Sequence, residues 1–450
     1  MKSITLTALD IGTNSIKAVC GVKDLKTGEI KILATAQLPC FGTRNGEVIK
    51  PEQVARAIDE AVSELSQKAN LKIRDCWATI GGSHIFSLAS QGLVSVARAD
   101  QKVSSEDVQR VLKAAQSVNL PKNKEVIDVF PQEFIVDGEG GVKDPVGMQG
   151  IRLEAKVLLV CLFSPLLENL EKAVGTAGLQ LTDVLVAPVA SSKAVLNDEQ
   201  KELGVMLLEI GAGVTSVAVF EKGDLKDFAI FPVGSANITN DIAIGFRTEI
   251  QMAENIKLDF AVLPGAVSEK RNLLKAKSKP AKKVKANKSE TNQVKPPEIS
   301  IIPETGVEFS LKLLDSIVEA RINQIITETQ KAMKKHLASQ SLPAGIVLTG
   351  GGANLPGLVE YVRQKLKLPC RLGKIQGFAP LEAHAKGAAD AVGGLPLTGF
   401  AGFSNSSRLA GALGLLLAGF ETEEGDEGQS HSAGNSVKDK IKRVVKSFLP

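Results

Sequence analysis

The 450-residue chain has few aromatic residues and few cysteines. Phe, Trp and Tyr make up 4% of it, with a single Trp and a single Tyr, so we expect aliphatic cores. The cysteines form no C-x-x-C pair, which argues against a disulfide framework and a thiolate zinc site and fits a reducing cytoplasm. They are Cys20, Cys40, Cys76, Cys161 and Cys370.

The sequence also lacks a signal peptide and long apolar runs. Its start, MKSITLTALDIG, has no sustained apolar segment of the kind that secretion requires. The longest apolar run, at residues 409–420, is interrupted by glycines and is too short to span a bilayer. We therefore expect a soluble chain.

The formal net charge is only +4, and it is unevenly distributed. Residues 269–295 hold ten Lys and Arg against two acids, a net charge of +8, which leaves −4 for the rest. A general basic face for nucleic acid is therefore not supported. The Lys-rich stretch 269–297 buries too little apolar surface to fold, so we expect a loop there.

A chain of this length predicts two or more domains. One pattern, strand, tight glycine turn, strand, strand and helix, occurs twice, about 200 residues apart. Its first copy has strands at 4–9, 15–22 and 30–37 and a helix at 51–68. The second begins at Gly204 with VMLLEI, VTSVAVF and DFAIFPV, followed by a helix from about Ile238. The repetition predicts two related α/β halves facing a cleft.

Residues 84–163 interrupt this repetition. We expect strands at 93–97, 126–136 and 153–163 and a helix at 108–118, with Ser104 as its N-cap. These elements predict an inserted α+β subdomain.

The glycine turn of the first half, Asp10-Ile-Gly-Thr-Asn-Ser-Ile-Lys17, connects two predicted strands. Such a turn can cradle phosphate with its backbone N–H groups, and a carboxylate at the strand end can hold the water shell of Mg²⁺. Considered alone, it could equally be an ordinary hairpin. The candidate nucleotide-binding residues are Asp10, Gly12, Thr13, Asn14, Ser15 and Lys17.

Two further glycine turns make the nucleotide interpretation more specific. The second half repeats the first turn with an acid, glycines and a hydroxyl: Glu209, Gly211, Gly213 and Thr215. A third cluster, Gly350, Gly351 and Gly352, would let a base and ribose approach the backbone. Together the three turns predict a site for a nucleoside triphosphate, with Asp10 and Glu209 holding Mg²⁺ through water.

This set of turns resembles the actin-like ATPase superfamily, which includes actin, sugar kinases and heat-shock chaperones. Within it, the sequence is similar to the FtsA family of bacterial cell-division proteins, over residues 4–420 apart from the Lys-rich stretch. The similar segments are GTRNGEVI (42–49), VFPQEFIVDG (129–138), KDPVGMQGIRLEAKV (143–157), ELGVMLLEIGAG (202–213), ITNDIA (238–243), AENIK (253–257) and AGIVLTGGGANLPGL (344–358).

The resemblance implies an actin-like, ribonuclease H-like fold whose inserted subdomain contacts neighbouring subunits in a filament. It implies that Glu254 and Lys257 contact the adenosine of ATP, although by themselves they would be an ordinary solvated pair. It also implies that residues 231–328 bind the C-terminal tail of FtsZ. Arg321 is our candidate for that contact, and the alternative is a solvated helix charge.

Two positions depart from the family pattern. Glu209 stands where the family usually has Asp, and Ser216 stands where it usually has a further acid. The longer Glu side chain would shift the carboxylate, and no general base stands out, so we expect ATP binding with weak or no hydrolysis. We expect the isolated His84, His336, His384 and His431 at the surface or at helix caps.

The last residues form an amphipathic pattern. On a helical wheel, one apolar arc is flanked by Lys and Arg and follows an acidic linker at 421–436, which is typical of a helix lying on an anionic membrane. The alternatives are a helix that docks onto its own protein and a frayed basic end. The arc contains Val437, Ile441, Val444, Val445, Phe448 and Leu449.

These observations predict an ATP-binding, actin-like cell-division protein. The resemblance implies that it self-assembles on the cytoplasmic face of the membrane at the septum, anchors the FtsZ ring and helps recruit later division proteins. The alternatives are an actin-like pilus-assembly ATPase and a sugar kinase. We expect a first half at 1–83, 164–195 and 380–420, an insert at 84–163, a second half at 196–230 and 329–379, an FtsZ-binding part at 231–328, the linker, and a membrane helix at 437–450.

Overall fold

The computed structural model describes residues 3–266, 299–301, 308–338, 342–379 and 407–424. The predictions for the Lys-rich stretch and for the amphipathic tail concern residues outside these ranges. Most of the acidic linker also lies outside them.

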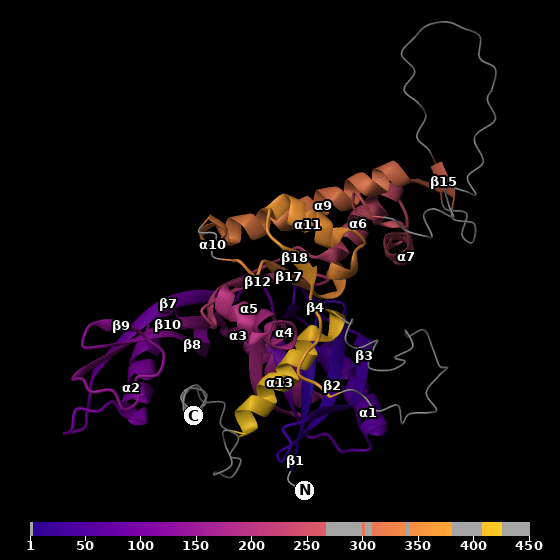
Figure 1. Ribbon diagram of the computed structural model, residues 1–450. Helices are drawn as coiled ribbons and strands as arrows, with labels where there is room; N and C mark the ends of the chain where they lie inside the picture. Colours follow the sequence, from indigo (N-terminus) through magenta and orange to yellow (C-terminus); the bar gives the residue numbers. More distant parts are fainter. Residues whose placement is uncertain (1–2, 267–298, 302–307, 339–341, 380–406, 425–450) are drawn as a thin grey trace, which may run out of the picture.

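Two five-stranded sheets with the same strand order form the centre of the molecule (Figure 1). In the first sheet the order is β11-β6-β1-β2-β3; β1, β2 and β3 are antiparallel neighbours, and β6 and β11 run parallel to β1. Its strands are β1 (Ser3–Ile11), β2 (Ser15–Asp24), β3 (Ile30–Pro39), β6 (Asp75–Ile80) and β11 (Gln180–Val186).

The second sheet repeats this arrangement with the order β18-β17-β12-β13-β14. Again three antiparallel strands are followed by two parallel ones. The predicted duplication is therefore confirmed. The strands are β12 (Val205–Ile210), β13 (Thr215–Glu221), β14 (Asp224–Phe231), β17 (Ile346–Thr349) and β18 (Cys370–Leu372).

Helices α4 (Ala187–Val195) and α13 (Ala410–Glu424) pack against each other, with α13 on the first sheet and α4 in contact with both sheets (Figure 1). Their backbones approach closely at Gly414, where a Cβ atom would lie 1.7 Å from the carbonyl oxygen of Ala190. The apolar run 409–420 thus forms part of a buried helix. No helix in the described ranges is both long and apolar enough to cross a membrane.

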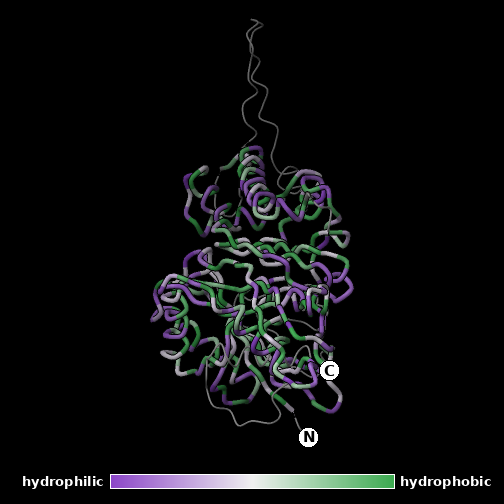
Figure 2. Tube along the Cα trace, turned by 90° about the vertical axis from the view of Figure 1, so that its left-hand side faces the viewer, coloured by the Kyte–Doolittle hydropathy of each residue, from purple (hydrophilic) through white to green (hydrophobic). Residues whose placement is uncertain are grey.

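The outer helices bury one face each. On the predicted helix at 51–68, Val54, Ile58, Ala61, Val62 and Leu65 are buried as expected. Figure 2 shows hydrophobic residues concentrated in the middle of the molecule, with hydrophilic stretches along the outer helices. The first sheet is covered by α1 (Pro51–Ala69) and α3 (Ser164–Thr176), and the second by α6 (Ser235–Phe246), α7 (Ile250–Phe260), α9 (Leu311–Ala332) and α11 (Leu358–Leu366).

The predicted insert has a sheet and a core of its own. The strand order of this sheet is β7-β10-β8-β9, and helix α2 packs on one of its faces. The predicted N-cap of α2 is confirmed, because the Ser104 side chain accepts a hydrogen bond from the Asp107 N–H. The predicted strand at 93–97 is wrong in its bounds, because this strand pairs with β10 from Phe86 onward. The elements are β7 (Phe86–Ser95), α2 (Ser105–Gln116), β8 (Lys124–Val136), β9 (Glu139–Val142) and β10 (Arg152–Phe163).

The longest helix of the second half is α9. It begins at Leu311, where Ser310 accepts a hydrogen bond from the Leu313 N–H and caps the helix. A short helix α10 (Lys334–Ala338) follows it.

Candidate functional site

The two glycine turns fold in the same way. In the β1–β2 hairpin the N–H of Gly12 donates to the Ser15 carbonyl oxygen at 3.1 Å. In the β12–β13 hairpin the N–H of Gly211 donates to the Val214 carbonyl oxygen at 2.9 Å. In each hairpin four residues lie between the last paired residues, which are Ile11 and Ile16 in the first and Ile210 and Thr215 in the second.

The structure brings these two hairpins into contact. A Cβ atom at Gly213 would lie 2.6 Å from Thr13 Oγ1, so only glycine permits this approach. Thr13 Oγ1 also accepts a hydrogen bond from the Gly46 N–H at 2.9 Å, which ties the first hairpin to the loop between β4 (Thr43–Arg44) and β5 (Glu47–Val48). Two turns about 200 residues apart in sequence thus form one surface.

The two predicted metal-holding carboxylates stand at the base of this surface. Asp10 forms an ion pair with Lys17, with 2.7 Å between Oδ2 and Nζ, and its Oδ1 accepts a hydrogen bond from Thr79 at 2.8 Å. Glu209 Oε1 accepts a hydrogen bond from the Ser191 hydroxyl at 2.8 Å. The second oxygen, Glu209 Oε2, is buried and has no partner among the described residues.

Glu209 is the titratable group that the site perturbs most. Burial and the nearby charge of Asp10 raise its pKa to about 7, against the opposing effects of Ser191 and Lys17. A cation placed beside Glu209 Oε2 would favour the ionised carboxylate. The described residues contain no cluster of three or more His, Cys, Asp or Glu able to ligate a metal directly.

One of the predicted phosphate contacts needs correction. Thr215 is fully buried, and its hydroxyl donates to the Val233 carbonyl oxygen at 2.7 Å, so it supports the fold instead of facing a ligand. Lys17 forms an ion pair with Asp10, and its contact with phosphate stays a prediction. Asn14, by contrast, is exposed at the tip of the first hairpin.

The third glycine cluster packs against the end of β12. Cβ atoms at Gly350 and Gly352 would lie 2.5 Å from the Ile210 carbonyl oxygen and from Ile210 Cγ2, respectively. The Gly350 N–H donates to the Ser407 carbonyl oxygen at 3.1 Å. Gly351 differs from both, because its Cβ would meet only Arg408 Cγ, at 3.9 Å. It is exposed and leaves open space above the loop.

Helix α7 connects to the second hairpin through α6. The Ser235 N–H donates to the Gly211 carbonyl oxygen at 2.8 Å, and Lys257 Nζ lies 3.3 Å from the Ser235 carbonyl oxygen. Lys257 also forms an ion pair with Glu254 at 2.7 Å. Because only 11% of the Lys257 side chain is exposed, this pair is not the ordinary solvated pair that the sequence alone suggests.

Arg321 lies on α9, in the part of the chain predicted to bind FtsZ. Its guanidinium forms a two-pronged ion pair with Asp241 of α6, and a third nitrogen donates to Gln324 at 2.6 Å. The alternative of a solvated helix charge is therefore wrong. That Arg321 contacts FtsZ stays a prediction. Its guanidinium already pairs with Asp241 within the protein, which neutralises part of its charge.

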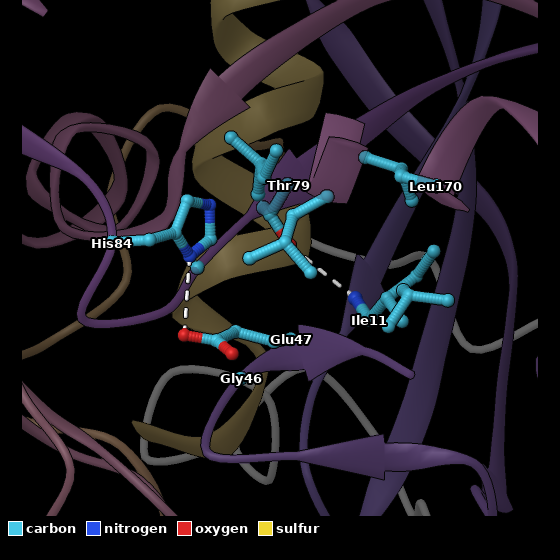
Figure 3. A pocket seen from close by; sticks show the side chains of 10 residues that line it. Ile11, Gly46, Glu47, Thr79, His84 and Leu170 are labelled. Atoms are coloured by element: carbon cyan, nitrogen blue, oxygen red, sulfur yellow. Dashed lines mark hydrogen bonds and ion pairs between the residues drawn. The ribbon is translucent and has the colours of Figure 1, made fainter. Parts of the chain in front are cut away.

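The expectation that the histidines are surface or capping residues is wrong for His84. Only 10% of its side chain is exposed, and its Nδ1 lies 3.2 Å from Glu47 Oε1 (Figure 3). The pair borders a pocket with Ile11 and Thr79 at the end of β1 and β6. Burial lowers the pKa of His84, and Glu47 acts in the opposite direction.

His336 is also mostly buried. Its Nδ1 lies 3.1 Å from Glu221 and its Nε2 lies 3.8 Å from Asp227, and these two carboxylates raise its pKa. Asp227 accepts a hydrogen bond from Ser87 of the insert. His336 therefore belongs to the joint between the insert and the second half. His384 and His431 lie outside the described residues, as do Val437, Ile441, Val444, Val445, Phe448 and Leu449.

Some site residues carry no recognisable sequence signal. Ser191, Thr79 and Ser407 contact the predicted residues from distant elements, and each is a common residue in an ordinary segment. Only the repeated spacing of acid, glycine and hydroxyl marks a site, and these three residues lie outside that repeat.

Comparisons with known proteins agree with this geometry. The family model "SHS2 domain inserted in FTSA" matches residues 82–161, and the model "Cell division protein FtsA" matches residues 206–393. Cell division protein FtsA of Pseudomonas aeruginosa is 34% identical over 82% of both chains. FtsA of Neisseria meningitidis is 30% identical over 98% of both, and FtsA of Bacillus subtilis is 30% identical over 80% of this chain and 76% of its own.

Solved structures show the fold. A chain of the PilM–PilN type IV pilus biogenesis complex superposes with a TM-score of 0.58 at 16% identity, over 92% of this chain and 98% of that one. MreB5 of Spiroplasma citri bound to ADP superposes with a TM-score of 0.50 at 11% identity, over 94% and 99%. At such identities these likenesses establish an actin-like fold, and the pilus-assembly alternative has no further support. Since the curated relatives match over most of their length, the chain belongs to the FtsA family of cell division proteins.

Proposed function

We propose that this protein binds ATP with Mg²⁺ between its two halves, assembles on the cytoplasmic face of the cell membrane and anchors FtsZ there during division. The observation that carries the nucleotide part is the contact between Thr13 and Gly213, which joins two like-folded phosphate hairpins above Asp10 and Glu209. Turns of this kind bind phosphate through their backbone N–H groups.

The residues at the base of the hairpins fit a hydrated Mg²⁺ ion. Glu209 Oε2 is a buried carboxylate oxygen without a described partner, and Asp10 adds a second negative charge nearby. Mg²⁺ keeps several of its waters and binds through one or two carboxylates and the phosphates of the nucleotide. When bound, it would neutralise phosphate charge, while Ser191 keeps Glu209 in position.

We expect slow hydrolysis or none. A general base must reach the attacking water, and Glu209 has one oxygen engaged by Ser191. The only buried histidine near the first hairpin, His84 among the described residues, faces Glu47. These contacts favour nucleotide binding as a switch for assembly over rapid turnover.

Membrane attachment and FtsZ binding rest on the family and on sequence patterns. The apolar arc ending in Phe448 and Leu449 would lie on an anionic leaflet, with its basic flanks adding a salt-sensitive attraction. One such helix is a weak anchor, so a filament that presents many would bind by avidity. The FtsZ tail would bind the part that contains α6, α7 and α9, and later division proteins would follow.

Gly351 offers a direct test of the nucleotide site. Because the protein leaves space around this position, Gly351→Leu should fold normally and fill the volume of the nucleotide. We expect ATP affinity, measured by calorimetry with Mg²⁺, to fall by at least about a hundredfold, which corresponds to about 2.7 kcal/mol.

A matched control uses Gly175, at the exposed end of α3, where a Cβ would meet no neighbour within 4 Å. Gly175→Leu should keep wild-type affinity. Equal ATP affinity in the Gly351→Leu and wild-type proteins would refute the proposed nucleotide site.

A further inference from the structure

A second cavity lies away from the hairpins, at the outer edge of the second sheet. It has a volume of about 500 Å³, and its floor is apolar. Figure 1 shows the elements around it, α11, β17 and β18, side by side in the second half. The lining residues are Ala344, Ile346, Leu368, Pro369 and Cys370, with Arg363, Lys367 and Arg371.

The chain around this cavity is strongly basic. Residues 363–374 contain five Lys and Arg and no acid. Arg363 is partly neutralised, because it forms an ion pair with Glu360 at 3.0 Å and donates to the Cys370 carbonyl oxygen. In the described ranges, Lys367 and Arg371 form no ion pair.

Arg371 carries an unusual unsatisfied group. Its Nη2 atom is buried and has no hydrogen-bond partner among the described residues. A buried guanidinium N–H without an acceptor is costly, and Arg371 also lines the cavity. An anion bound beside this side chain would offset part of the cost of keeping its charge out of water.

β18 adds backbone groups to this basic lining. Among the described strands it is the last of its sheet, and its one neighbour there is β17. An edge strand offers N–H and C=O groups to an extended peptide, and neighbouring pockets then select its side chains.

We propose that this cavity, the α11–β18 pocket, binds an acidic peptide segment of a partner protein, with its carboxylates on Lys367 and Arg371 and an apolar side chain on the floor. Free phosphate is too small to use the apolar floor. A membrane surface could reach exposed cations such as Lys367, but lipid headgroups would not pair with the backbone groups along the edge of β18. Charge complementarity and the apolar floor together therefore favour a peptide.

The test measures fluorescence anisotropy of a short labelled peptide of Glu and Asp with interspersed Val, against a matched peptide of Gln and Asn with the same Val. We expect the full-length protein to bind the acidic peptide at low salt and the neutral one at least about tenfold more weakly. Arg371→Gln and Lys367→Gln should each weaken binding about tenfold, as expected for the loss of one charge-assisted hydrogen bond.

Lys365→Gln is the matched control, because Lys365 lies in the last turn of α11, two residues before Lys367, but sits over the Tyr361 ring, outside the lining. It should change affinity less than about twofold. Lys367 is exposed, so Lys367→Gln tests the proposal even if Arg371→Gln fails to fold.

Three results would overturn the proposal. Equal weakening by Lys365→Gln would indicate a diffuse charge effect, and full competition by millimolar inorganic phosphate would indicate a simple anion site. Loss of binding to anionic vesicles in the Arg371→Gln and Lys367→Gln proteins, without any peptide binding in the wild type, would assign these cations to the membrane.

Discussion

At the scale of single residues, Glu209 holds the least favourable position in the described site. Its carboxylate is buried near Asp10, with one oxygen bonded to Ser191 and the other unsatisfied. On our proposal, the protein tolerates this arrangement because Glu209 would help to hold the hydrated Mg²⁺ ion, and perturbed groups in clefts often have such a role.

The pKa of Glu209 predicts a pH dependence of stability. Between the ordinary value of 4.5 and about 7, native Glu209 keeps a proton that the unfolded chain has released, so the free energy of unfolding falls as the pH rises through this range. The Gln side chain of the Glu209→Gln variant does not ionise, so this variant does not lose stability in that way. In nucleotide-free protein, the free energy of unfolding of the variant minus that of the wild type should therefore be larger at pH 8 than at pH 5, by on the order of 3 kcal/mol.

Urea unfolding at both pH values measures this difference. Glu139→Gln, at an exposed position of the insert, serves as the control and should show no such change. If Glu209→Gln shifts stability equally at pH 5 and pH 8, the raised pKa is not a property of the folded protein.

Arg321 allows a test that separates its internal and external roles. Both Arg321→Gln and Asp241→Asn break the same ion pair between α9 and α6. Only the first removes the cation, so Arg321→Gln should weaken binding of an FtsZ tail peptide about tenfold, while Asp241→Asn should leave it unchanged or stronger. Equal weakening in both variants would mean that Arg321 acts only through the fold.

The sequence predicted those site residues that share a repeated pattern. Gly12 and Gly211, with their flanking acids, recur at corresponding positions of two similar cycles. The contacts of Ser191 and Thr79 could not be predicted, because they depend on how distant strands and helices pack. For Thr215, the same pattern suggested a ligand contact where the hydroxyl instead holds the backbone of Val233.

At the scale of elements, α13 shows what periodicity misses. Its sequence is apolar all round, so it has no amphipathic stripe from which a helix face could be read. Its glycines, which interrupt the apolar run in the sequence, are the positions where other residues pack closely against the helix. Gly411 faces Asp10, Gly414 faces Ala190, and Gly419 faces Trp77. The neighbouring strands β1 and β2, by contrast, were predicted to within a few residues.

Gly414 should therefore be intolerant of any side chain. Gly414→Ala would place its Cβ against the Ala190 carbonyl oxygen and force α13 away from α4. We expect a loss of about 3 kcal/mol in the free energy of unfolding, measured by urea denaturation. Gly175→Ala, at the open end of α3, should be neutral or stabilising by up to about 1 kcal/mol. Equal stability of Gly414→Ala and wild type would contradict the close packing of α4 and α13.

At the scale of the whole molecule, the two halves meet through the hairpins, and the insert joins the second half through Ser87, Asp227 and His336. A nucleotide bound between the hairpins would contact both halves at once. It could thus favour one relative arrangement of the halves and, through this joint, one orientation of the insert. If the protein assembles into filaments as we propose, this joint would give the nucleotide a route to control assembly without hydrolysis.

The account's central claim is that this protein, with ATP bound, links FtsZ to the membrane. The most direct measurement is the fraction of FtsZ that sediments with anionic vesicles in the presence of this protein and MgATP. With the wild-type protein, FtsZ should sediment with the vesicles. With Gly351→Leu, which should not bind ATP, or Phe448→Glu, which should not bind the membrane, FtsZ should stay in the supernatant. If FtsZ sediments equally with all three proteins, the claim is wrong.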